Sequence, residues 1–305
     1  MTVRQTSLQL LLLLLVLVLV GVGAFCMRPI SFFLTYSDLR LKMQGAESLF
    51  ETVDGISVHY FALGPEDGPA VVLVHGLGGR AEDWRNLAPL LAKAGYRVFM
   101  PDLPGYGKSA KPADFSYSVP DEARVVVNFM DALHLQRVDL GGWSMGGWIV
   151  QEIAAAHPER IRKLLLFDSA GLNIRPDWNI ALFTPQNAAE LAQLNELLMP
   201  HPPRMPAFVA RDILRISHED AWVTQRALAS MLTGTYTTNA ILPTLSMPVL
   251  IVWGAEDHIT PVSQGATIHN LIPQSRLNVI QGCGHLAPDQ CAARIAPGVL
   301  NFLND

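Results

Sequence analysis

Residues 138–156 pass from an apolar run through a glycine-rich turn into a helical pattern, and this turn restricts the possible folds more than any other segment. The turn reads GGWSMGG, with Ser144 at its centre. A strand that passes directly into a helix holds the residue at the tip in strained backbone angles, so the residues two positions away must be small. Gly142 and Gly146 meet this requirement. The pattern predicts a strand–turn–helix unit that exposes the Ser144 hydroxyl at one end of a sheet.

The rest of the chain after Gly45 alternates short apolar runs with helical stretches. A hairpin is expected over residues 49–64, then strands over 70–76, 96–102, 137–142, 163–169, 248–254 and 275–282, and helices over 122–135, 145–157 and 287–303. Unbroken apolar runs are typical of parallel strands covered on both faces. We therefore predict an α/β fold, a mostly parallel sheet flanked by helices, with its core in residues 49–171 and 246–305.

The interval 172–245 breaks this rhythm, because it has no clear strand and reads as several short helices interrupted by MPHPPRMP. We predict that it forms a helical cap over one end of the sheet. Its many apolar residues either line a pocket for an aliphatic chain or form the cap's own core, and the second explanation accounts for most of them.

The amino-terminal end is strongly apolar. Residues 10–27 contain no charged side chain, and as a helix they would be about 27 Å long, close to the thickness of a bilayer's hydrocarbon core. We predict a single-pass membrane anchor over residues 1–28 and a juxtamembrane connector over 29–48, where Phe32, Tyr36, Leu39 and Met43 recur at helical spacing. A signal peptide cleaved after Ala24, giving a secreted or periplasmic protein, and a lipoprotein signal at residue 26 stay open. Basic residues on both sides of the span leave its orientation open.

Composition excludes several classes of function. The net charge is −5 and there is no run of Lys or Arg, which argues against a nucleic-acid partner. The sequence has no HExxH, no CxxC pair and no His cluster with ligand spacing, so we expect no metal site. The three cysteines are too few for a disulfide framework, and we interpret them as free or buried thiols; a bridge between Cys283 and Cys291 stays open for an oxidising compartment.

A serine hydroxyl is a poor nucleophile without a base, and the base needs an acid to orient it. His285 lies in GCGHLAP, between the last strand and the last helix, where a glycine-rich loop can reach the sheet end. For the acid we favour Asp257 in VWGAEDHITP, with Glu256 the weaker neighbour. Asp168, at the end of the preceding strand, is the serious rival.

Two backbone amides are candidates for an oxyanion hole. Leu77 follows the strand that ends in His75 and Gly76, and Met145 begins the helix after Ser144. We interpret His75 as a structural residue that anchors this loop. The glycines of DLPGYGKS lack the spacing of a phosphate-binding loop.

The motifs HGLGG, DLPGYGKS, GWSMGG, VWGAEDHITP and GCGH, in this order, resemble the α/β-hydrolase superfamily from about Phe50 to the carboxyl end. The resemblance implies the α/β-hydrolase fold with Ser144, Asp257 and His285 as a catalytic triad, and the serine excludes the groups that use an aspartate nucleophile. With its apolar amino terminus and cap, the chain is similar to the membrane-anchored monoacylglycerol lipase branch and its bacterial relatives. Trp143 is bulkier than the residue expected there in that branch, and we expect it to border the acyl pocket.

We therefore expect a membrane-tethered carboxylic ester hydrolase that acts on monoacylglycerols or similar lipid esters, without a cofactor or a protein partner. Two alternatives stay open. One is a carbon–carbon bond hydrolase of aromatic catabolism, which needs a basic residue to hold a substrate carboxylate; the cap offers Arg175, Arg204, Arg211, Arg215 and Arg226. The other is a hydrolase fold that serves as a non-catalytic binding protein.

Overall fold

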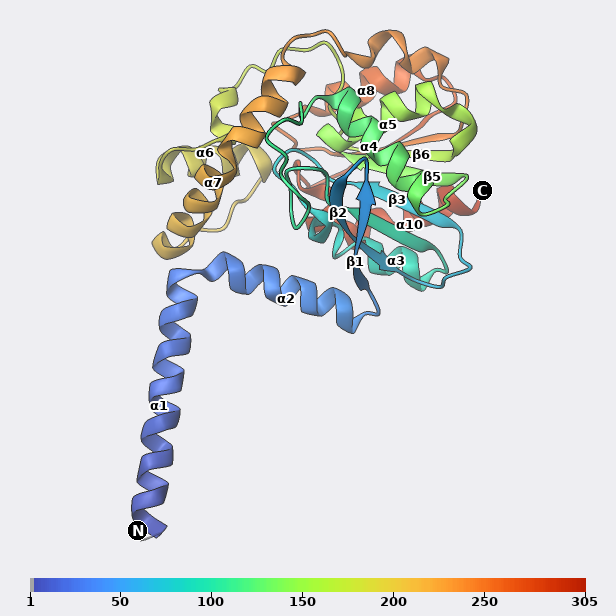
Figure 1. Ribbon diagram of the computed structural model, residues 1–305. Helices are drawn as coiled ribbons and strands as arrows, with labels where there is room; N and C mark the ends of the chain where they lie inside the picture. The colour runs from blue at the N-terminus through green and yellow to red at the C-terminus, as the bar shows by residue number, and fades with distance from the viewer. Residues whose placement is uncertain (1–2) are drawn as a thin grey trace.

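The computed structural model describes the backbone of residues 3–305 and the side chains from residue 12 onward (Figure 1). In these residues the central element is an eight-stranded sheet in the order β1-β2-β4-β3-β5-β6-β7-β8. Its strands are β1 (Glu47–Val53), β2 (Ile56–Leu63), β3 (Ala70–Val74), β4 (Arg97–Pro101), β5 (Val138–Trp143), β6 (Ile161–Phe167), β7 (Val249–Gly254) and β8 (Arg276–Ile280). In this order, every neighbouring pair from β4 through β3 to β8 is parallel, which confirms the predicted mostly parallel sheet.

The predicted opening hairpin is present. β1 pairs antiparallel with β2, and β2 pairs antiparallel with β4. Asp54 and Gly55 form the turn with positive φ values of 52° and 79°, the two-residue geometry that matches the twist of the flanking strands. The hairpin adds an antiparallel edge to the parallel sheet.

Helices cover both faces of the sheet. One face packs against α4 (Val119–Ala132), α5 (Met145–Ala156) and α8 (Val262–Leu271), and the other against α3 (Ala88–Lys93) and α10 (Ala292–Asn304). Along β3, alternate residues belong to the two cores: Val72 and Val74 to the first, Val71 and Leu73 to the second. This alternation is the reason the strand is apolar throughout. Short 3₁₀ turns at η1 (Ala81–Trp84) and η2 (Pro158–Arg160) complete the connections.

Two predicted helices differ from the structure in their bounds. α4 begins at Val119, three residues before the predicted 122, because the Ser118 side chain accepts the Asp121 amide and caps the helix. The last helix, predicted over 287–303, is broken into α9 (Ala287–Gln290) and α10 at Cys291.

The segment between β6 and β7 forms the predicted helical part, and its two α-helices lie to the left in Figure 1. It contains η3 (Ile180–Phe183), α6 (Ala188–Leu198), α7 (Ala207–Met231), η4 (Thr238–Ala240) and η5 (Leu242–Thr244), and residues 168–248 include no strand. The proline-rich stretch separates α6 from α7, because proline cannot continue a helix. We call this segment the cap; the exact domain bounds stay predictions.

The amino-terminal segment forms two helices, α1 (Val3–Met27) and α2 (Pro29–Met43), and α1 points away from the rest of the molecule (Figure 1). Each side chain from Leu12 to Val20 is more than half exposed. Among the residues described, no single helix combines the length and hydropathy needed to cross a bilayer; Leu12–Met27 and Pro29–Met43 do so only together, with a bend of 99° between them. The transmembrane helix predicted within residues 1–28 stays a prediction, and residues 1–2 lie outside the described part.

The connector helix α2 packs against the rest of the protein through one side, and the apolar stripe predicted from its helical spacing lies on the opposite side. Phe32, Tyr36, Leu39 and Met43 are all exposed, whereas Leu41 is fully buried. α2 contacts α7 of the cap and η1 of the core. The predicted amphipathic helix therefore turns its aromatic and aliphatic stripe outward.

Candidate active site

Ser144 lies on the sharp turn between β5 and α5, with φ 57° and ψ −118°. Such angles are strained for a residue with a side chain. The turn closes only because its neighbours lack a Cβ: one at Gly142 would lie 2.2 Å from the Gly146 carbonyl oxygen, and one at Gly146 would lie 2.3 Å from the Val74 carbonyl oxygen. These two glycines therefore fulfil the steric requirement inferred from the sequence.

The structure brings Ser144, His285 and Asp257 together in a hydrogen-bonded chain. His285 Nε2 lies 2.9 Å from Ser144 Oγ, and His285 Nδ1 lies 2.8 Å from Asp257 Oδ2. Because a carboxylate only accepts, Nδ1 carries the proton and Nε2 is left to accept from the serine hydroxyl. All three residues are buried. The arrangement can remove a proton from Ser144 and stabilise the imidazolium that forms.

Asp257 is held by its own loop. Its Oδ1 accepts the backbone amides of Ile259 and Thr260 at 2.8 and 3.0 Å, and the Thr260 hydroxyl donates to Oδ2 at 2.8 Å. The same hydroxyl lies 3.3 Å from His285 Nδ1. Thr260 therefore supports both the acid and the base, a role that the sequence did not indicate because a threonine three residues after an aspartate is an ordinary loop feature.

The two rival acids lie elsewhere. Asp168 Oδ1 accepts the Gly254 amide at 2.6 Å, and complete burial, together with the charge of Asp257, raises the pKa of Asp168 well above its ordinary value. Glu256 accepts the Gly282 amide at 3.0 Å. Among the described contacts neither carboxyl group reaches His285, so the geometry favours Asp257.

The loop that carries His285 is closed by a disulfide, and here our interpretation of the cysteines was wrong. Cys283 and Cys291, both buried, form a bridge across eight positions of sequence. The Arg294 guanidinium lies 3.0 and 2.9 Å from the two sulfur atoms and donates to the Gln281 carbonyl at 2.6 Å. Sequence spacing alone could not show that the last strand and helix bring the two cysteines together. Cys26 is free and exposed.

The predicted oxyanion donors adjoin the serine. Met145 is the first residue of α5, so its amide has no carbonyl partner within the helix and lies at the positive end of the helix dipole. Leu77 follows Gly76, where a Cβ would lie 3.0 Å from Ser144 Cβ. This close approach places the Leu77 peptide beside the turn. The oxyanion hole formed by Leu77 and Met145 stays a prediction.

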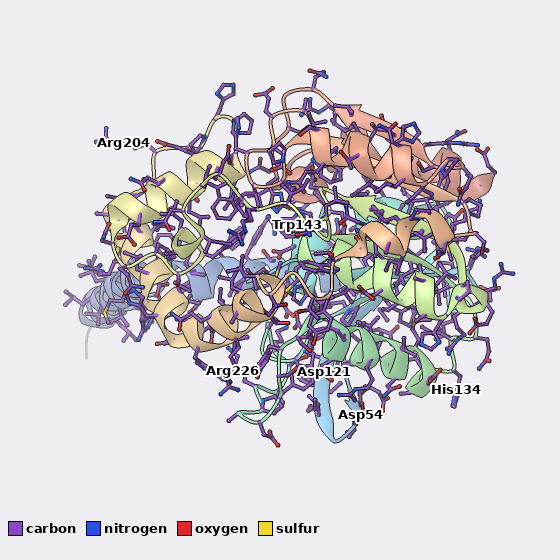
Figure 2. The ribbon with its side chains drawn as sticks, turned by 90° about the horizontal axis from the view of Figure 1, so that it is seen from above. Asp54, Asp121, His134, Trp143, Arg204 and Arg226 are labelled. Carbon is purple, nitrogen blue, oxygen red and sulfur yellow. A yellow bond between two sulfur atoms is a disulfide. The ribbon has the colours of Figure 1, made fainter. Side chains whose placement is uncertain are left out.

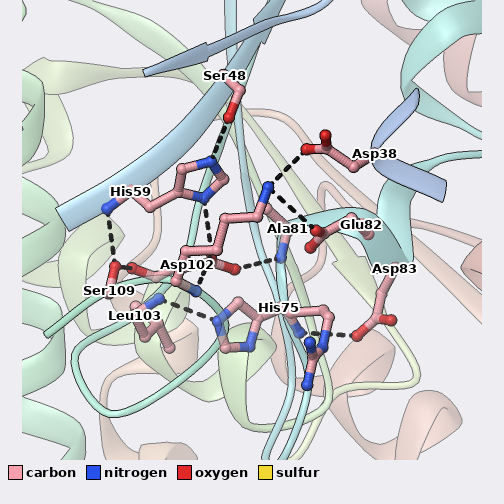
Figure 3. A network of polar contacts seen from close by, with 12 residues as sticks. Asp38, Ser48, His59, His75, Ala81, Glu82, Asp83, Asp102, Leu103 and Ser109 are labelled. Atoms are coloured by element: carbon pink, nitrogen blue, oxygen red, sulfur yellow. Dashed lines mark hydrogen bonds and ion pairs between the residues drawn. The ribbon is translucent and has the colours of Figure 1, made fainter. Parts of the chain in front are cut away.

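A buried polar network supports the loop beneath these amides (Figure 3). The Leu103 amide donates to His75 Nε2 at 3.0 Å, and His75 Nδ1 contacts the Gly76 carbonyl at 2.8 Å, so His75 anchors the loop as expected. Asp102 accepts from the amides of Ala81 and Lys108 at 2.6 and 2.9 Å. Although burial alone raises the pKa of Asp102, these bonds and the neighbouring histidines lower it overall.

The same network contains a second Ser–His–Asp chain. Ser48 Oγ lies 2.9 Å from His59 Nε2, and His59 Nδ1 lies 2.7 Å from Asp102 Oδ2 (Figure 3). Ser48, however, lies within β1, paired with Phe61 in β2, and not at the beginning of a helix. It therefore lacks the helix amino terminus that adjoins Ser144, and this chain ties the hairpin to the loop after β4.

Trp143 lies where the cap meets the end of the sheet (Figure 2). It is only 8% exposed, and its indole Nε1–H donates to the His285 carbonyl oxygen at 2.7 Å. Trp143 also lines a cavity beneath the cap. It therefore has a structural role that the sequence did not reveal, in addition to bordering a pocket.

Two cavities of about 350 Å³ each lie between the cap and the sheet end. The first cavity is lined by Ser144, and the second by Trp143, while Leu77 and Phe183 line both. A volume of this size suits a small organic molecule. Among the described residues no group of three or more His, Cys, Asp or Glu is placed to hold a metal ion.

Residues 69–290 match the family described as alpha/beta hydrolase fold, and the chain belongs to this family. It is 30% identical over 259 residues to a 2-hydroxymuconate semialdehyde hydrolase of Pseudomonas sp. (strain CF600), covering 77% of this chain and 87% of the relative. It is 32% identical to 2-hydroxy-6-oxononadienedioate/2-hydroxy-6-oxononatrienedioate hydrolase 2 of Pseudomonas putida, covering 81% and 92% of the two chains. Among solved structures, a bacterial membrane phospholipase A superposes with a TM-score of 0.81 at 26% identity, over 98% of this chain and 100% of the other.

Proposed function

We propose that this protein is a serine hydrolase that cleaves carboxylic esters of lipid-like molecules such as monoacylglycerols. The observation that carries the proposal is the continuous contact from Asp257 through His285 to Ser144, with Ser144 facing a cavity under the cap. The similarity to a membrane phospholipase A over nearly the whole chain supports a lipid ester as the substrate.

The proposed reaction passes through an acyl-enzyme. His285 Nε2 takes the proton of Ser144 Oγ as the oxygen attacks the ester carbonyl, and the amides of Leu77 and Met145 stabilise the oxyanion. The imidazolium, stabilised by Asp257, gives its proton to the alcohol oxygen as the ester C–O bond breaks. Water, deprotonated by His285, then attacks the acyl-enzyme, and the imidazolium gives this proton to Ser144 Oγ as the acyl C–O bond breaks, which releases the acid and restores the serine.

We also propose that the amino-terminal segment attaches the protein to a membrane. The exposed aliphatic side chains from Leu12 to Val20 and the outward stripe of α2 support this attachment, because water is a poor solvent for both surfaces. The buried Cys283–Cys291 bridge supports a catalytic domain on an oxidising side, outside the cytoplasm. Washing membranes with alkaline carbonate should leave the protein in the pellet; its release into the supernatant would contradict the attachment.

A second candidate function is carbon–carbon bond hydrolysis, favoured by the names of the two curated relatives and by Arg175, which lines the first cavity. A guanidinium there could hold a substrate carboxylate. The other cap arginines offer less: Arg204 and Arg226 are exposed and lie on the outside of the cap (Figure 2), and Arg226 donates to the Phe115 carbonyl at 3.3 Å.

A substrate comparison separates the two candidates. Purified full-length protein in detergent is given monoacylglycerols of rising chain length and, separately, a ring-fission product that bears a vinylogous 1,5-diketone and a carboxylate. Ester hydrolysis that rises with chain length supports our proposal. Turnover of the ring-fission product with loss of that activity in Arg175→Ala, and no hydrolysis of monoacylglycerols, would establish the second candidate.

A further inference from the structure

The two cavities beside Ser144 differ in chemistry. Polar side chains of the first cavity include Asn173, Arg175, Thr233 and Gln264. The second cavity is lined by the charged residues Arg80, Asp83 and Asp220 and by a larger set of aliphatic side chains: Ile30, Leu77, Leu194, Leu198, Ile213, Ile216 and Leu286. Since Leu77 and Phe183 line both, the cavities adjoin at the residue that carries a predicted oxyanion amide.

An ester bound for attack at Ser144 needs room on two sides, one for the acyl chain and one for the alcohol. We propose that the second cavity receives the aliphatic acyl chain and that the first cavity receives the polar alcohol portion. This assignment rests on the proposed ester hydrolysis and adds which surface selects which part of the substrate. An aliphatic chain gains most where it removes apolar wall from water, whereas hydroxyl groups need polar partners.

Two acidic side chains of the second cavity have partners within the protein, whereas the hydroxyl of Tyr106, which also lines it, is buried without a hydrogen-bond partner among the described residues. Asp83 Oδ2 accepts the Arg80 amide at 2.9 Å, and burial raises the pKa of Asp83 to about 6. Asp220 pairs with Lys111. These two carboxyl groups are therefore engaged with the protein itself, and most of the other side chains that line the second cavity are apolar, which suits a hydrocarbon chain.

The second cavity reaches the amino-terminal helices, because Ile30 of α2 lines it. The position of Ile30 is fixed by the cap: its amide donates at 3.0 Å to Oδ2 of Asp212, a buried residue of α7. Arg215 holds the other oxygen of Asp212 at 2.9 Å, and Arg28 lies 3.7 Å from it. Ile30 therefore forms a fixed wall where α1, α2 and the cap meet, and we infer that this wall sets how long an acyl chain fits.

Two substitutions at Ile30 test the assignment in opposite directions. Ile30→Trp fills the cavity, and the ratio of kcat/KM for p-nitrophenyl dodecanoate to that for the butanoate should fall at least about tenfold. Ile30→Ala enlarges the cavity and should shift the preferred chain to a longer one. The matched control is Ile174→Trp, which fills the first cavity; it should lower hydrolysis of glyceryl butanoate relative to ethyl butanoate and leave the chain-length ratio unchanged.

The assignment is overturned if both Ile30 variants keep the wild-type chain-length profile, or if Ile174→Trp changes that profile while Ile30→Trp does not. Labelling of each variant by a fluorophosphonate shows that it is folded and has a reactive serine. If the wild type hydrolyses no ester of any length, the proposed function fails and the assignment falls with it, an outcome distinct from an unchanged profile in an active enzyme.

Discussion

The indole Nε1–H of Trp143 donates to the backbone carbonyl oxygen of His285 at 2.7 Å. Trp143, which directly precedes the proposed nucleophile, therefore holds the backbone of His285, the proposed base. The two rings lie 5.6 Å apart between centroids. On the other side of this histidine, its amide donates to the Leu198 carbonyl of the cap at 3.0 Å. The imidazole is thus positioned through its backbone by both the core and the cap.

Replacing Trp143 by Phe keeps an aromatic ring but removes the bond to His285. A hydrogen bond of this kind contributes about 1 kcal/mol, so we expect kcat to fall by about fivefold. The loss should be in kcat more than in KM, because the bond positions the base. Ester hydrolysis by W143F is compared with that of W222F, whose ring packs against Tyr117; equal effects of the two variants would contradict the positioning role.

Asp257→Asn should reduce kcat on the order of a thousandfold or more, because an amide cannot orient and stabilise the imidazolium. Asp168→Asn should change kcat little, since Asp168 makes no hydrogen bond to His285 among the described residues and an amide oxygen can still accept the Gly254 amide. Comparing kcat for steady-state ester hydrolysis by the two variants shows which aspartate is the catalytic acid. The reverse ranking would make Asp168 the catalytic acid.

The Cys283–Cys291 bridge should stabilise the His285 loop. Replacing both cysteines by Ser should lower the free energy of unfolding by about 2–3 kcal/mol for a loop of this length and should also lower kcat. Treating the wild type with a dithiol should produce the same loss of activity, and reoxidation should restore it. Cys26→Ser, at the free exposed cysteine, is the control. Full activity after verified reduction would show that the bridge does not position the base.

Glu122 predicts how stability depends on pH. Neither of its buried carboxyl oxygens has a hydrogen-bond partner among the described residues, and burial, with the nearby Asp121 charge, raises its pKa well above the ordinary 4.5. Because the pKa of Glu122 is higher in the folded state than in the unfolded state, the stability that this carboxyl group contributes is fully present below pH 4.5. This contribution is lost as the pH rises through the folded-state pKa. Glu122→Gln removes this dependence.

We therefore expect the Tm of Glu122→Gln to exceed that of the wild type by an amount that grows as the pH rises above the ordinary carboxyl pKa of 4.5. Thermal unfolding followed by circular dichroism at each pH gives the difference. The exposed Glu159→Gln serves as control, since its side chain is 68% exposed. Parallel Tm curves for Glu122→Gln and wild type would contradict this account.

The strand–turn–helix unit was predictable because the tightness of the turn is a local property: a Cβ at Gly142 would meet the Gly146 carbonyl oxygen four positions away. The clash of a Cβ at Gly146 with the Val74 carbonyl oxygen of β3 required the structure. The positions of Asp257 and His285 at the sheet end followed from where their strands end. The parallel sheet was predictable for a similar reason, since its strands are covered on both faces and carry unbroken apolar runs.

Features that depend on contacts between distant segments were not predictable. The bond from Trp143 to His285 joins residues 142 positions apart. The Cys283–Cys291 bridge spans only eight positions, but whether two cysteines at this spacing meet depends on how the loop between them folds. The stripe of α2 was recognised, but its outward direction depends on how Leu41 packs into the core. The contact between Ile30 and Asp212 spans 182 positions, and no local pattern indicates it.

Covalent labelling of Ser144 tests the central claim most directly. Full-length wild-type protein is treated with a fluorophosphonate, and the modified residue is located by mass spectrometry of its peptides beside a Ser144→Ala variant of equal Tm. We predict one label on Ser144, none on Ser144→Ala, and a loss of ester hydrolysis of at least about a thousandfold in that variant. A folded wild type that takes no label, or a variant that labels equally, would contradict the account and favour a non-catalytic binding protein.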